Sequence, residues 1–210
     1  MSLPIIHING FPGVGKLTIA RELVTLFGSY NARLVHNHLL IDPAGAILPR
    51  SSEDYQPLRK AIRAALFDTL ATSRDTFNSL YIFTDFQSDN DTGRAVMAEY
   101  HAMAARRGCA LIHIIVTSSK EENLRRVVTP ERSQHGKLVE SELLAQLREE
   151  TVIYQPPADS FQIQLDTTEL DAASAALILH QRILRIFADG FLMEMFRCCP
   201  SLRWTGRLKY

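Results

Sequence analysis

The stretch GFPGVGKLT, from Gly10 to Thr18, decides the fold that this sequence predicts. Gly10, Gly15 and Lys16 have the G-x-x-x-x-G-K spacing of loops that bind phosphate groups. Glycines let the backbone curl so that successive N–H groups point inward at an anion, and Lys16 adds a mobile positive charge for the β- and γ-phosphates. We therefore expect this loop to bind the phosphates of ATP or GTP.

The segments on either side of the loop favour the same interpretation. Ile5–Asn9 is a short apolar run, which predicts a buried strand, and residues 16–27 carry apolar side chains at helical spacing. The helix that follows directs the positive end of its dipole at the bound anion. The expected nucleotide-binding residues are Gly10, Gly13, Val14, Gly15, Lys16, Leu17 and Thr18.

Apolar strand patterns alternate with helical patterns along most of the chain. Further strands are expected at residues 32–35, 80–84, 110–117 and 161–165, and helices at residues 16–27, 58–71, 92–107, 120–150 (broken near Pro130 and Gly136) and 172–187. Such alternation predicts an α/β protein with a five-stranded parallel sheet and helices on both faces, the three-layer P-loop NTPase fold. We expect one domain over residues 1–189 and a basic C-terminal appendage over residues 190–210.

The residue after the lysine departs from the strict phosphate-loop motif. That motif places Ser or Thr there to ligate Mg²⁺, whereas Leu17 holds the position here and Thr18 follows. The pattern Gly-x-Pro-Gly-x-Gly-Lys-x-Thr resembles the loop of adenylate kinases and related small-molecule kinases, and the likeness extends over roughly residues 5–187 as an order of elements. It implies a kinase domain, ATP as the nucleotide, and Thr18 as a ligand of Mg²⁺.

The stretch VHNHLLID, residues 35–42, follows the second predicted strand. Substrates of doubly wound sheets bind at the carboxyl ends of the strands. The stretch is similar in layout to one in shikimate kinases, with His36 and His38 in place of two aspartates and Asp42 as the final acid; chloramphenicol phosphotransferases also carry an acid here. Because imidazole is a base near pH 7 but a poorer Mg²⁺ ligand than carboxylate, His38 or Asp42 is expected to deprotonate the acceptor. The alternative is that these groups cap the next segment or bond to the backbone.

Asp85 ends the third predicted strand, which would lie beside the strand that leads into the loop. An acid in this position holds Mg²⁺ directly or through water in many kinases. Adenylate kinases have a similar Asp-Gly-Phe-Pro-Arg stretch, whose Pro and Arg this chain lacks. The alternative is a helix N-cap or a turn residue.

A segment rich in arginine lies between the fourth and fifth predicted strands, at about residues 120–150. In similar kinases this segment is a lid, whose arginines stabilise charge on the transferring phosphoryl group. Arg126 and Arg132 are the candidates for that role. The alternative is an exposed helix face with ion pairs such as Glu122–Arg126. Arg59 and Arg63 are expected on an exposed helix face, with binding of an anionic acceptor as the alternative.

Composition limits the possible partners. The 210 residues have a formal net charge of zero, so binding to nucleic acid or to a membrane surface is not expected. The three cysteines form neither a disulfide framework nor a zinc motif, and no signal peptide or membrane span is apparent, so a cytoplasmic location is expected. The sequence leaves the oligomeric state open.

Together these patterns predict a Mg²⁺- and ATP-dependent phosphotransferase that acts on a small-molecule hydroxyl group. The expected partners are a nucleoside triphosphate and a small acceptor. Alternatives are a nucleoside or nucleotide kinase, a kinase of polynucleotide ends that would use the basic tail, and a nucleotide-binding protein without turnover.

Overall fold

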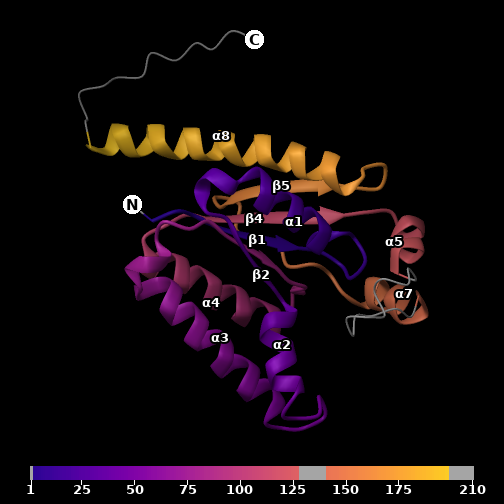
Figure 1. Ribbon diagram of the computed structural model, residues 1–210. Helices are drawn as coiled ribbons and strands as arrows, with labels where there is room; N and C mark the ends of the chain where they lie inside the picture. The colour runs from indigo at the N-terminus through magenta and orange to yellow at the C-terminus, as the bar shows by residue number, and fades with distance from the viewer. Residues whose placement is uncertain (1, 128–140, 199–210) are drawn as a thin grey trace.

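A parallel five-stranded sheet forms the centre of the molecule (Figure 1). The computed structural model describes residues 2–127 and 141–198. The strands are β1 (Ile5–Asn9), β2 (Arg33–His36), β3 (Tyr81–Thr84), β4 (Leu111–Thr117) and β5 (Phe161–Asp166), and they lie in the order β2-β3-β1-β4-β5. The predicted α/β class and the five parallel strands are confirmed. All five residues of β1 are buried, as expected of a central strand covered on both faces.

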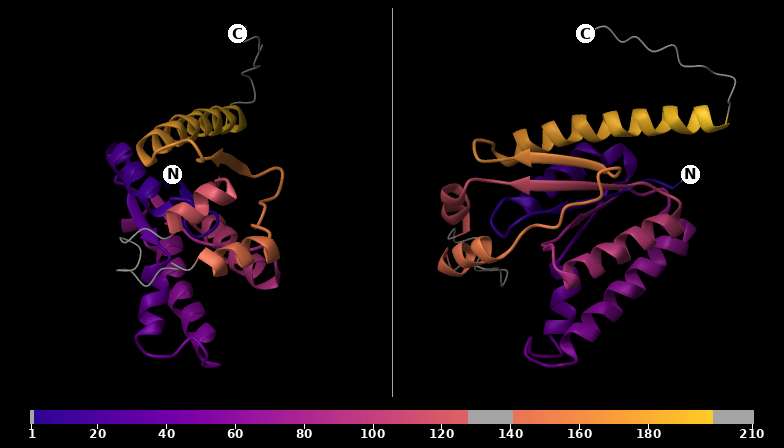
Figure 2. Two further views of the ribbon diagram at one scale, coloured as in Figure 1. Left: turned by 90° about the vertical axis from the view of Figure 1, so that its right-hand side faces the viewer. Right: turned by 180° about the vertical axis from the view of Figure 1, so that it is seen from behind.

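Helices cover both faces of the sheet, which gives the three predicted layers (Figures 1 and 2). On one face lie α1 (Lys16–Leu26) and α8 (Ala172–Cys198), and on the other lie α3 (Tyr55–Thr72) and α4 (Asp91–Arg107). Each face has its own apolar core. One contains Leu23 and Phe27 among its buried side chains, and the other contains Phe67, Phe83 and Tyr100.

The remaining helices lie near the carboxyl ends of the strands (Figure 1). They are α2 (His38–Gly45), α5 (Lys120–Val127) and α7 (Ser141–Glu150), and two short 3₁₀ turns occupy Gly28–Tyr30 and Arg74–Thr76. The prediction of two helices within residues 120–150 is confirmed for the described parts, while Pro130, Arg132 and Gly136 lie outside the described residues. None of the helices in residues 2–127 and 141–198 is long and apolar enough to span a bilayer.

The last helix is longer than the sequence predicted. The pattern favoured an end at residue 187, but α8 continues to Cys198 and passes through Gly190. A glycine inside a helix costs only about 1 kcal/mol relative to alanine, so it does not by itself end one. The boundary expected between residues 189 and 190 therefore falls within a helix, and residues 199–210 of the expected appendage lie outside the described residues.

The topology brings three chain segments to one edge of the sheet. β1 pairs in parallel with both β3 and β4, and β3 pairs in parallel with β2, so that Ile8, Thr84 and His36 lie in register. The glycine-rich loop after β1, Asp85 after β3 and α2 after β2 consequently all begin at the same edge. Ligands of doubly wound sheets bind at this kind of edge.

Candidate active site

The backbone of the glycine-rich loop, residues 10–18, tolerates no side chain at two positions. Gly10 has φ of +152° and Gly13 has φ of +94°. A Cβ atom at Gly10 would collide with the carbonyl oxygen of Val116, and one at Gly13 would collide with the side chain of Asn123. The loop is therefore packed tightly against its neighbours, with its shape fixed from outside.

Carbonyl groups of the loop are occupied by neighbouring donors. Lys16 Nζ donates to the carbonyl oxygens of Gly10 (2.5 Å) and Phe11 (2.8 Å), and Asn123 Nδ2 donates to that of Pro12 (2.9 Å). Helix α1 starts at Lys16 without a side-chain cap. Its first-turn N–H groups lack intrahelical acceptors, so the loop and the helix end together can receive an anion.

Asn9 joins the start of the loop to the segment after β3. Its Oδ1 accepts hydrogen bonds from the backbone N–H groups of Gly10 (2.9 Å) and Gln87 (2.8 Å), and its Nδ2 donates to the Gln87 carbonyl oxygen (2.9 Å). Asn9 was not among the site residues predicted from the sequence. The available signal was a polar amide side chain at the end of a buried strand, directly before the loop.

Asp85 lies buried beside this junction. Its Oδ2 accepts from Gln87 Nε2 (2.5 Å), and its Oδ1 accepts from the backbone N–H of Phe86 (2.8 Å). Burial raises the pKa of Asp85, and the hydrogen bonds together with the charges of Arg59 and Lys16 oppose that rise.

Asp85 is neither a helix N-cap nor a turn residue. The N-cap of α4 is Asn90, whose side chain accepts from the Gly93 N–H, so Asp85 is not the helix cap. The bond to the Phe86 N–H joins adjacent residues, and residues 85–87 form no turn. The positive charges of Arg59 and Lys16 favour the ionised form of Asp85. An ionised carboxylate at this edge is a group that can bind a cation.

The two predicted metal ligands do not line the same cavity. Thr18 is exposed and faces a cavity that Asp85 does not line. Successive residues of a helix point about 100° apart, so the side chain of Thr18 leaves α1 in a different direction from that of Leu17. Within the described residues there is no group of three or more His, Cys, Asp or Glu side chains that could hold a metal ion.

His38 and Asp42, the two candidate bases, form one pair. His38 Nδ1 lies 3.0 Å from Asp42 Oδ1, one turn apart on α2. The His38 side chain is 23% exposed and that of Asp42 is 69% exposed. The ring of His36 lies 6.2 Å from that of His38, measured between centroids. Because α2 follows β2 directly, the pair stands at the edge of the sheet that carries the loop.

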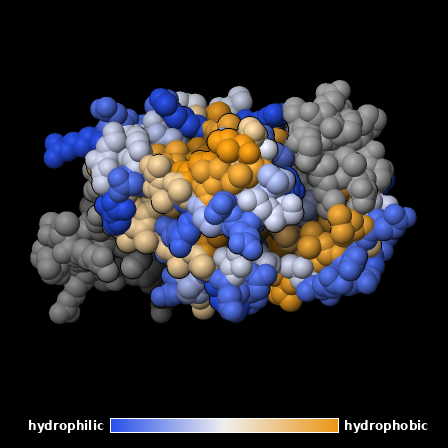
Figure 3. Space-filling view, turned by 90° about the horizontal axis from the view of Figure 1, so that it is seen from below, coloured by the Kyte–Doolittle hydropathy of each residue, from blue (hydrophilic) through white to orange (hydrophobic). Residues whose placement is uncertain are grey.

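Two large apolar side chains are exposed at α2 and just after it. Leu39 is 50% exposed and Ile47, just after α2, is 71% exposed. Seen from below, the molecule shows a cluster of apolar side chains near the middle of this face (Figure 3). The surface beside the His38–Asp42 pair is thus not purely polar.

The two arginines on α3, Arg59 and Arg63, have different surroundings. Arg63 is buried and its Nε donates to Glu99 Oε2 at 2.6 Å, so the expectation of an exposed position was wrong for it. Arg59 lies over the ring of Tyr55, with Cζ 5.9 Å from the centroid. Its Nε is buried and has no hydrogen-bond partner among the described residues.

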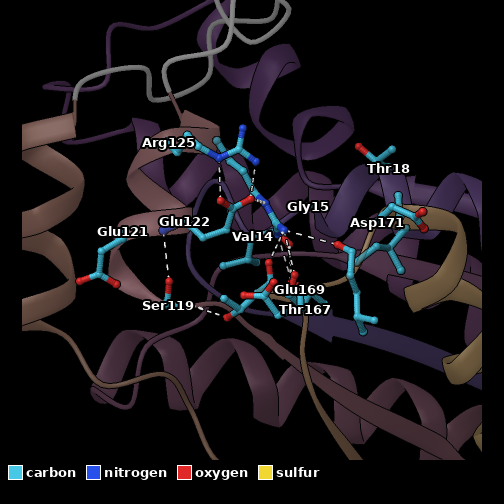
Figure 4. A pocket seen from close by; sticks show the side chains of 15 residues that line it. Val14, Gly15, Thr18, Ser119, Glu121, Glu122, Arg125, Thr167, Glu169 and Asp171 are labelled. Atoms are coloured by element: carbon cyan, nitrogen blue, oxygen red, sulfur yellow. Dashed lines mark hydrogen bonds and ion pairs between the residues drawn. The ribbon is translucent and has the colours of Figure 1, made fainter.

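A cavity of about 780 Å³ opens on the other side of the loop (Figure 4). Its lining includes Thr18, the α5 residues Glu122, Arg125 and Arg126, and residues 167–172, which follow β5 and end at the first residue of α8. In Figure 4, Thr18 and Asp171 lie on one side of the cavity, and Glu121 and Arg125 lie on the other. Its volume is in the range of small-ligand pockets, ~300–1,000 Å³.

Arg126 fastens one wall of this cavity to another. Its Nη2 donates to the carbonyl oxygens of Thr167 (2.8 Å) and Thr168 (3.3 Å), and its Nε donates to Glu122 (2.6 Å). Hydrogen bonds from Arg125, and less strongly from Arg126, lower the pKa of Glu122 to about 2. The ion pair that the sequence offered as an alternative to a lid arginine is therefore present, together with loop contacts that it did not predict.

No protein-family model and no curated protein matches this sequence. Solved structures do match. A gluconokinase from Sinorhizobium meliloti aligns over 90% of this chain and 97% of its own, with a TM-score of 0.60 and 15% identity. The tunicamycin resistance protein of Deinococcus radiodurans gives 0.57 at 20% identity, over 86% and 95% of the two chains. A shikimate kinase from Acinetobacter baumannii gives 0.51 at 18% identity, over 90% and 94%.

The fold is that of the P-loop kinases. At these identities the likeness establishes the fold, and it confirms the resemblance to kinases drawn from the loop sequence. In this P-loop kinase fold the loop, Asp85 and the His38–Asp42 pair gather at one edge of the sheet. What the site does must be argued from these residues.

Proposed function

We propose that this protein is a Mg²⁺- and ATP-dependent kinase that phosphorylates a hydroxyl group of a small molecule. The observation that carries the proposal is the His38–Asp42 pair, which stands after β2 at the sheet edge where the glycine-rich loop follows β1. A phosphate site and a candidate base thus share one edge. Direct transfer of a phosphoryl group needs the acceptor and the donor phosphates side by side, and a shared edge supports this.

The nucleotide would occupy the loop and the 780 Å³ cavity together. The loop N–H groups would hold the phosphates, and Thr18 and residues 167–172 would line the space for the sugar and base. Lys16 donates to two loop carbonyl groups in this structure. On nucleotide binding it would exchange those acceptors for the oxygens of the β- and γ-phosphates, where its charge stabilises the transferring group.

The residues at this edge fit a magnesium ion that arrives with the nucleotide. Mg²⁺ in kinases is held by one or two carboxylates, waters and phosphate oxygens, so a preformed cage is not needed. Asp85 supplies the carboxylate, and its neighbours Lys16 and Arg59 already act on its pKa. Bound Mg²⁺ would neutralise charge on the phosphates.

The His38–Asp42 pair would handle the acceptor proton. With Asp42 accepting from Nδ1–H, the imidazole presents an unprotonated Nε2. The acceptor oxygen forms a bond to the γ-phosphorus, the bond from that phosphorus to the bridging oxygen of ADP breaks, and the hydroxyl proton passes to Nε2. The carboxylate then stabilises the imidazolium.

The acceptor would carry an apolar portion and an anionic group. Leu39 and Ile47 expose apolar surface at α2, and Arg59 brings a guanidinium whose Nε is buried without a partner among the described residues. The charge of Arg59 acts to lower the pKa of Asp85, which supports a place for this charge near the same edge. A carboxylate or phosphate on the acceptor would pair with this guanidinium group.

A screen of acceptors by ADP release tests the proposal. Pools of hydroxylated metabolites, with and without carboxylate or phosphate groups, are offered with Mg²⁺-ATP to the wild type and to Lys16→Met. An acceptor should raise ADP release in the wild type, and Lys16→Met should lower the rate ~10²–10³-fold. If no acceptor raises turnover and Lys16→Met leaves ATP affinity unchanged, the proposal fails.

A further inference from the structure

Asn123 is a polar side chain on α5 that is completely buried against the glycine-rich loop. Its Nδ2 donates to the carbonyl oxygen of Pro12 at 2.9 Å. Its Oδ1 accepts from Arg148 Nη1 of α7 at 2.7 Å. Both ends of the amide are therefore satisfied, which explains how the group can be buried without penalty.

The bond to Pro12 fixes the direction of a neighbouring N–H group. The peptide between Pro12 and Gly13 is trans and planar, so its C=O and N–H point to opposite sides. Since the carbonyl oxygen points outward to Asn123, the Gly13 N–H points the other way, toward the inside of the loop. Because proline lacks a backbone N–H, the carbonyl oxygen of Pro12 is its one backbone group that can form a hydrogen bond. Asn123 uses this group to hold the loop.

Arg148 braces the amide from the opposite side. Its Nη2 also donates to the Ser118 carbonyl oxygen at 3.2 Å, and its Cζ lies 5.0 Å from the ring centroid of Phe11 in the loop. The amide of an asparagine can turn over unless both of its ends are held. Arg148 supplies the donor that keeps Oδ1 toward α7 and therefore Nδ2 toward Pro12.

The loop and Asn123 are packed so closely that there is no space for a side chain at Gly13. A side chain at Gly13 would meet Asn123 Nδ2, and the backbone oxygen of Asn123 would lie only 3.2 Å from the added carbon. Helix α5 and the loop are thus in direct contact at this point. Small shifts of Asn123 would be passed on to the Gly13 peptide.

We infer that Asn123, braced by Arg148, is a positioning residue that aims the Gly13 N–H at a phosphate of the bound nucleotide. The inference rests on the proposed binding of nucleoside triphosphate by the loop. Asn123 acts through the Pro12–Gly13 peptide, and Arg148 acts through Asn123. Neither side chain is assigned a contact with the substrate.

A double-mutant cycle on ligand affinity tests this chain of contacts. The dissociation constants of Mg²⁺-ATP, inorganic tripolyphosphate and adenosine are measured for the wild type, Asn123→Ala, Arg148→Ala and the double variant. Asn123→Ala should weaken the binding of ATP and of tripolyphosphate about tenfold, because one hydrogen-bond donor to a charged group is misdirected. The binding of adenosine should weaken less than twofold. Because Arg148 acts only through Asn123, the double variant should bind polyphosphate no more weakly than Asn123→Ala.

The controls separate positioning from stability. Gln146→Ala alters an exposed residue of α7 that bonds to Glu150, and it should bind all three ligands as the wild type does. Melting temperatures are recorded for every variant. If Asn123→Ala does not give folded protein, Arg148→Ala replaces it in the test, because this variant leaves the Asn123–Pro12 bond in place. Its affinity for tripolyphosphate should fall about threefold, and its affinity for adenosine should not change.

Three results would overturn the inference. Polyphosphate affinities equal to the wild type, with lowered melting temperatures, would show a purely structural role. Additive losses in the double variant would show that Arg148 acts on the phosphates directly. A wild type that binds no polyphosphate would overturn the proposed function as well, which distinguishes that failure from the first two.

Discussion

His38 Nδ1 and Asp42 Oδ1 lie 3.0 Å apart on successive turns of α2, where that helix follows β2. The contact turns two separate candidates for the acceptor base into one unit. In such a unit the carboxylate fixes which ring nitrogen carries the proton, and the other nitrogen acts on the substrate. The two residues therefore have different expected effects when changed.

His38→Asn should lower kcat ~10²–10⁴-fold, the usual contribution of a general base. Asp42→Asn should lower kcat about tenfold, less than His38→Asn, because Asp42 is 69% exposed and water can replace part of its hydrogen bond. The Michaelis constant for ATP should stay unchanged in both variants. Steady-state kinetics with the acceptor found by the screen measures these values.

The matched control for Asp42→Asn is Asp68→Asn on α3, an exposed acid whose partner is Arg106. It should retain wild-type kinetics. Equal losses for His38→Asn and Asp42→Asn in the Michaelis constant of the acceptor alone, with kcat intact, would show that the pair binds the acceptor without taking its proton.

Arg126→Met should raise the Michaelis constant for ATP about tenfold and weaken adenosine binding by a similar factor. Arg126 holds the carbonyl groups of Thr167 and Thr168 at the wall of the cavity, so its loss should loosen the site for the base. Tripolyphosphate, which needs only the loop, should bind normally. A large fall in kcat with unchanged adenosine affinity would instead support action on the transferring phosphoryl group, the role that the sequence suggested.

Three histidines lie close together where α4 packs on the sheet: His7 is in β1, His113 is in β4 and His101 is in α4. The ring centroids of His7 and His113 lie 6.2 Å apart, and those of His101 and His113 lie 5.0 Å apart. Burial lowers the pKa of His7 and that of His113 from the ordinary 6.5 to about 3. The unfolded chain therefore binds these protons at a higher pH than the folded protein does. Stability should be complete above about pH 6.5 and should fall as the pH drops toward 3.

Urea unfolding at several pH values measures this effect. Between about pH 6.5 and 4.5 each of the two histidines should remove about 1.4 kcal/mol of unfolding free energy per pH unit. His113→Phe should reduce the slope of unfolding free energy against pH by the contribution of one histidine, about 1.4 kcal/mol per pH unit. A free energy of unfolding that stays flat over this range would contradict the burial of two neutral imidazoles.

Arg107 is a buried cation held by oxygen atoms of the backbone. Its guanidinium donates to the carbonyl oxygens of Leu3, Leu70, Thr76 and Ser79, at 2.6 to 3.3 Å. Arg107→Met would leave several buried acceptors unpaired and should lower the free energy of unfolding by about 3 kcal/mol. Arg107→Lys should not retain the wild-type free energy of unfolding, because an ammonium group cannot reproduce the planar set of five donors.

The neighbouring Arg106 offers a matched control on the same helix. It is about half exposed and pairs with Asp68 at the surface. Arg106→Met should change the unfolding free energy by less than about 1 kcal/mol. Similar losses for the two arginines in chemical denaturation would contradict the account of Arg107.

Much of the fold could be predicted because its signals are local. The spacing of Gly10, Gly15 and Lys16, the apolar run Ile5–Asn9 and the alternation of strands and helices each depend on neighbours in sequence. The end of α8 at Cys198 was not predicted, because a glycine such as Gly190 weakens a helix without ending it.

The contacts around the loop were harder to foresee because they are distant in sequence. Asn123 and Arg148 look like ordinary polar residues of exposed helices, and only the fold brings Asn123 to Pro12 across 111 positions. The same holds for Arg126, whose contacts with residues 167–170 span more than forty positions. The pairing of His38 with Asp42 could have been found, since residues four apart on a helix are neighbours.

Transfer of label from γ-labelled ATP tests the central claim most directly. The protein is incubated with Mg²⁺, labelled ATP and the hydroxylated acceptor pools, and the products are separated. The label should appear on an acceptor, in an amount equal to the ADP formed, and Lys16→Met should abolish most of it. Label that stays in ATP with every acceptor, or that appears only as inorganic phosphate, would contradict the account.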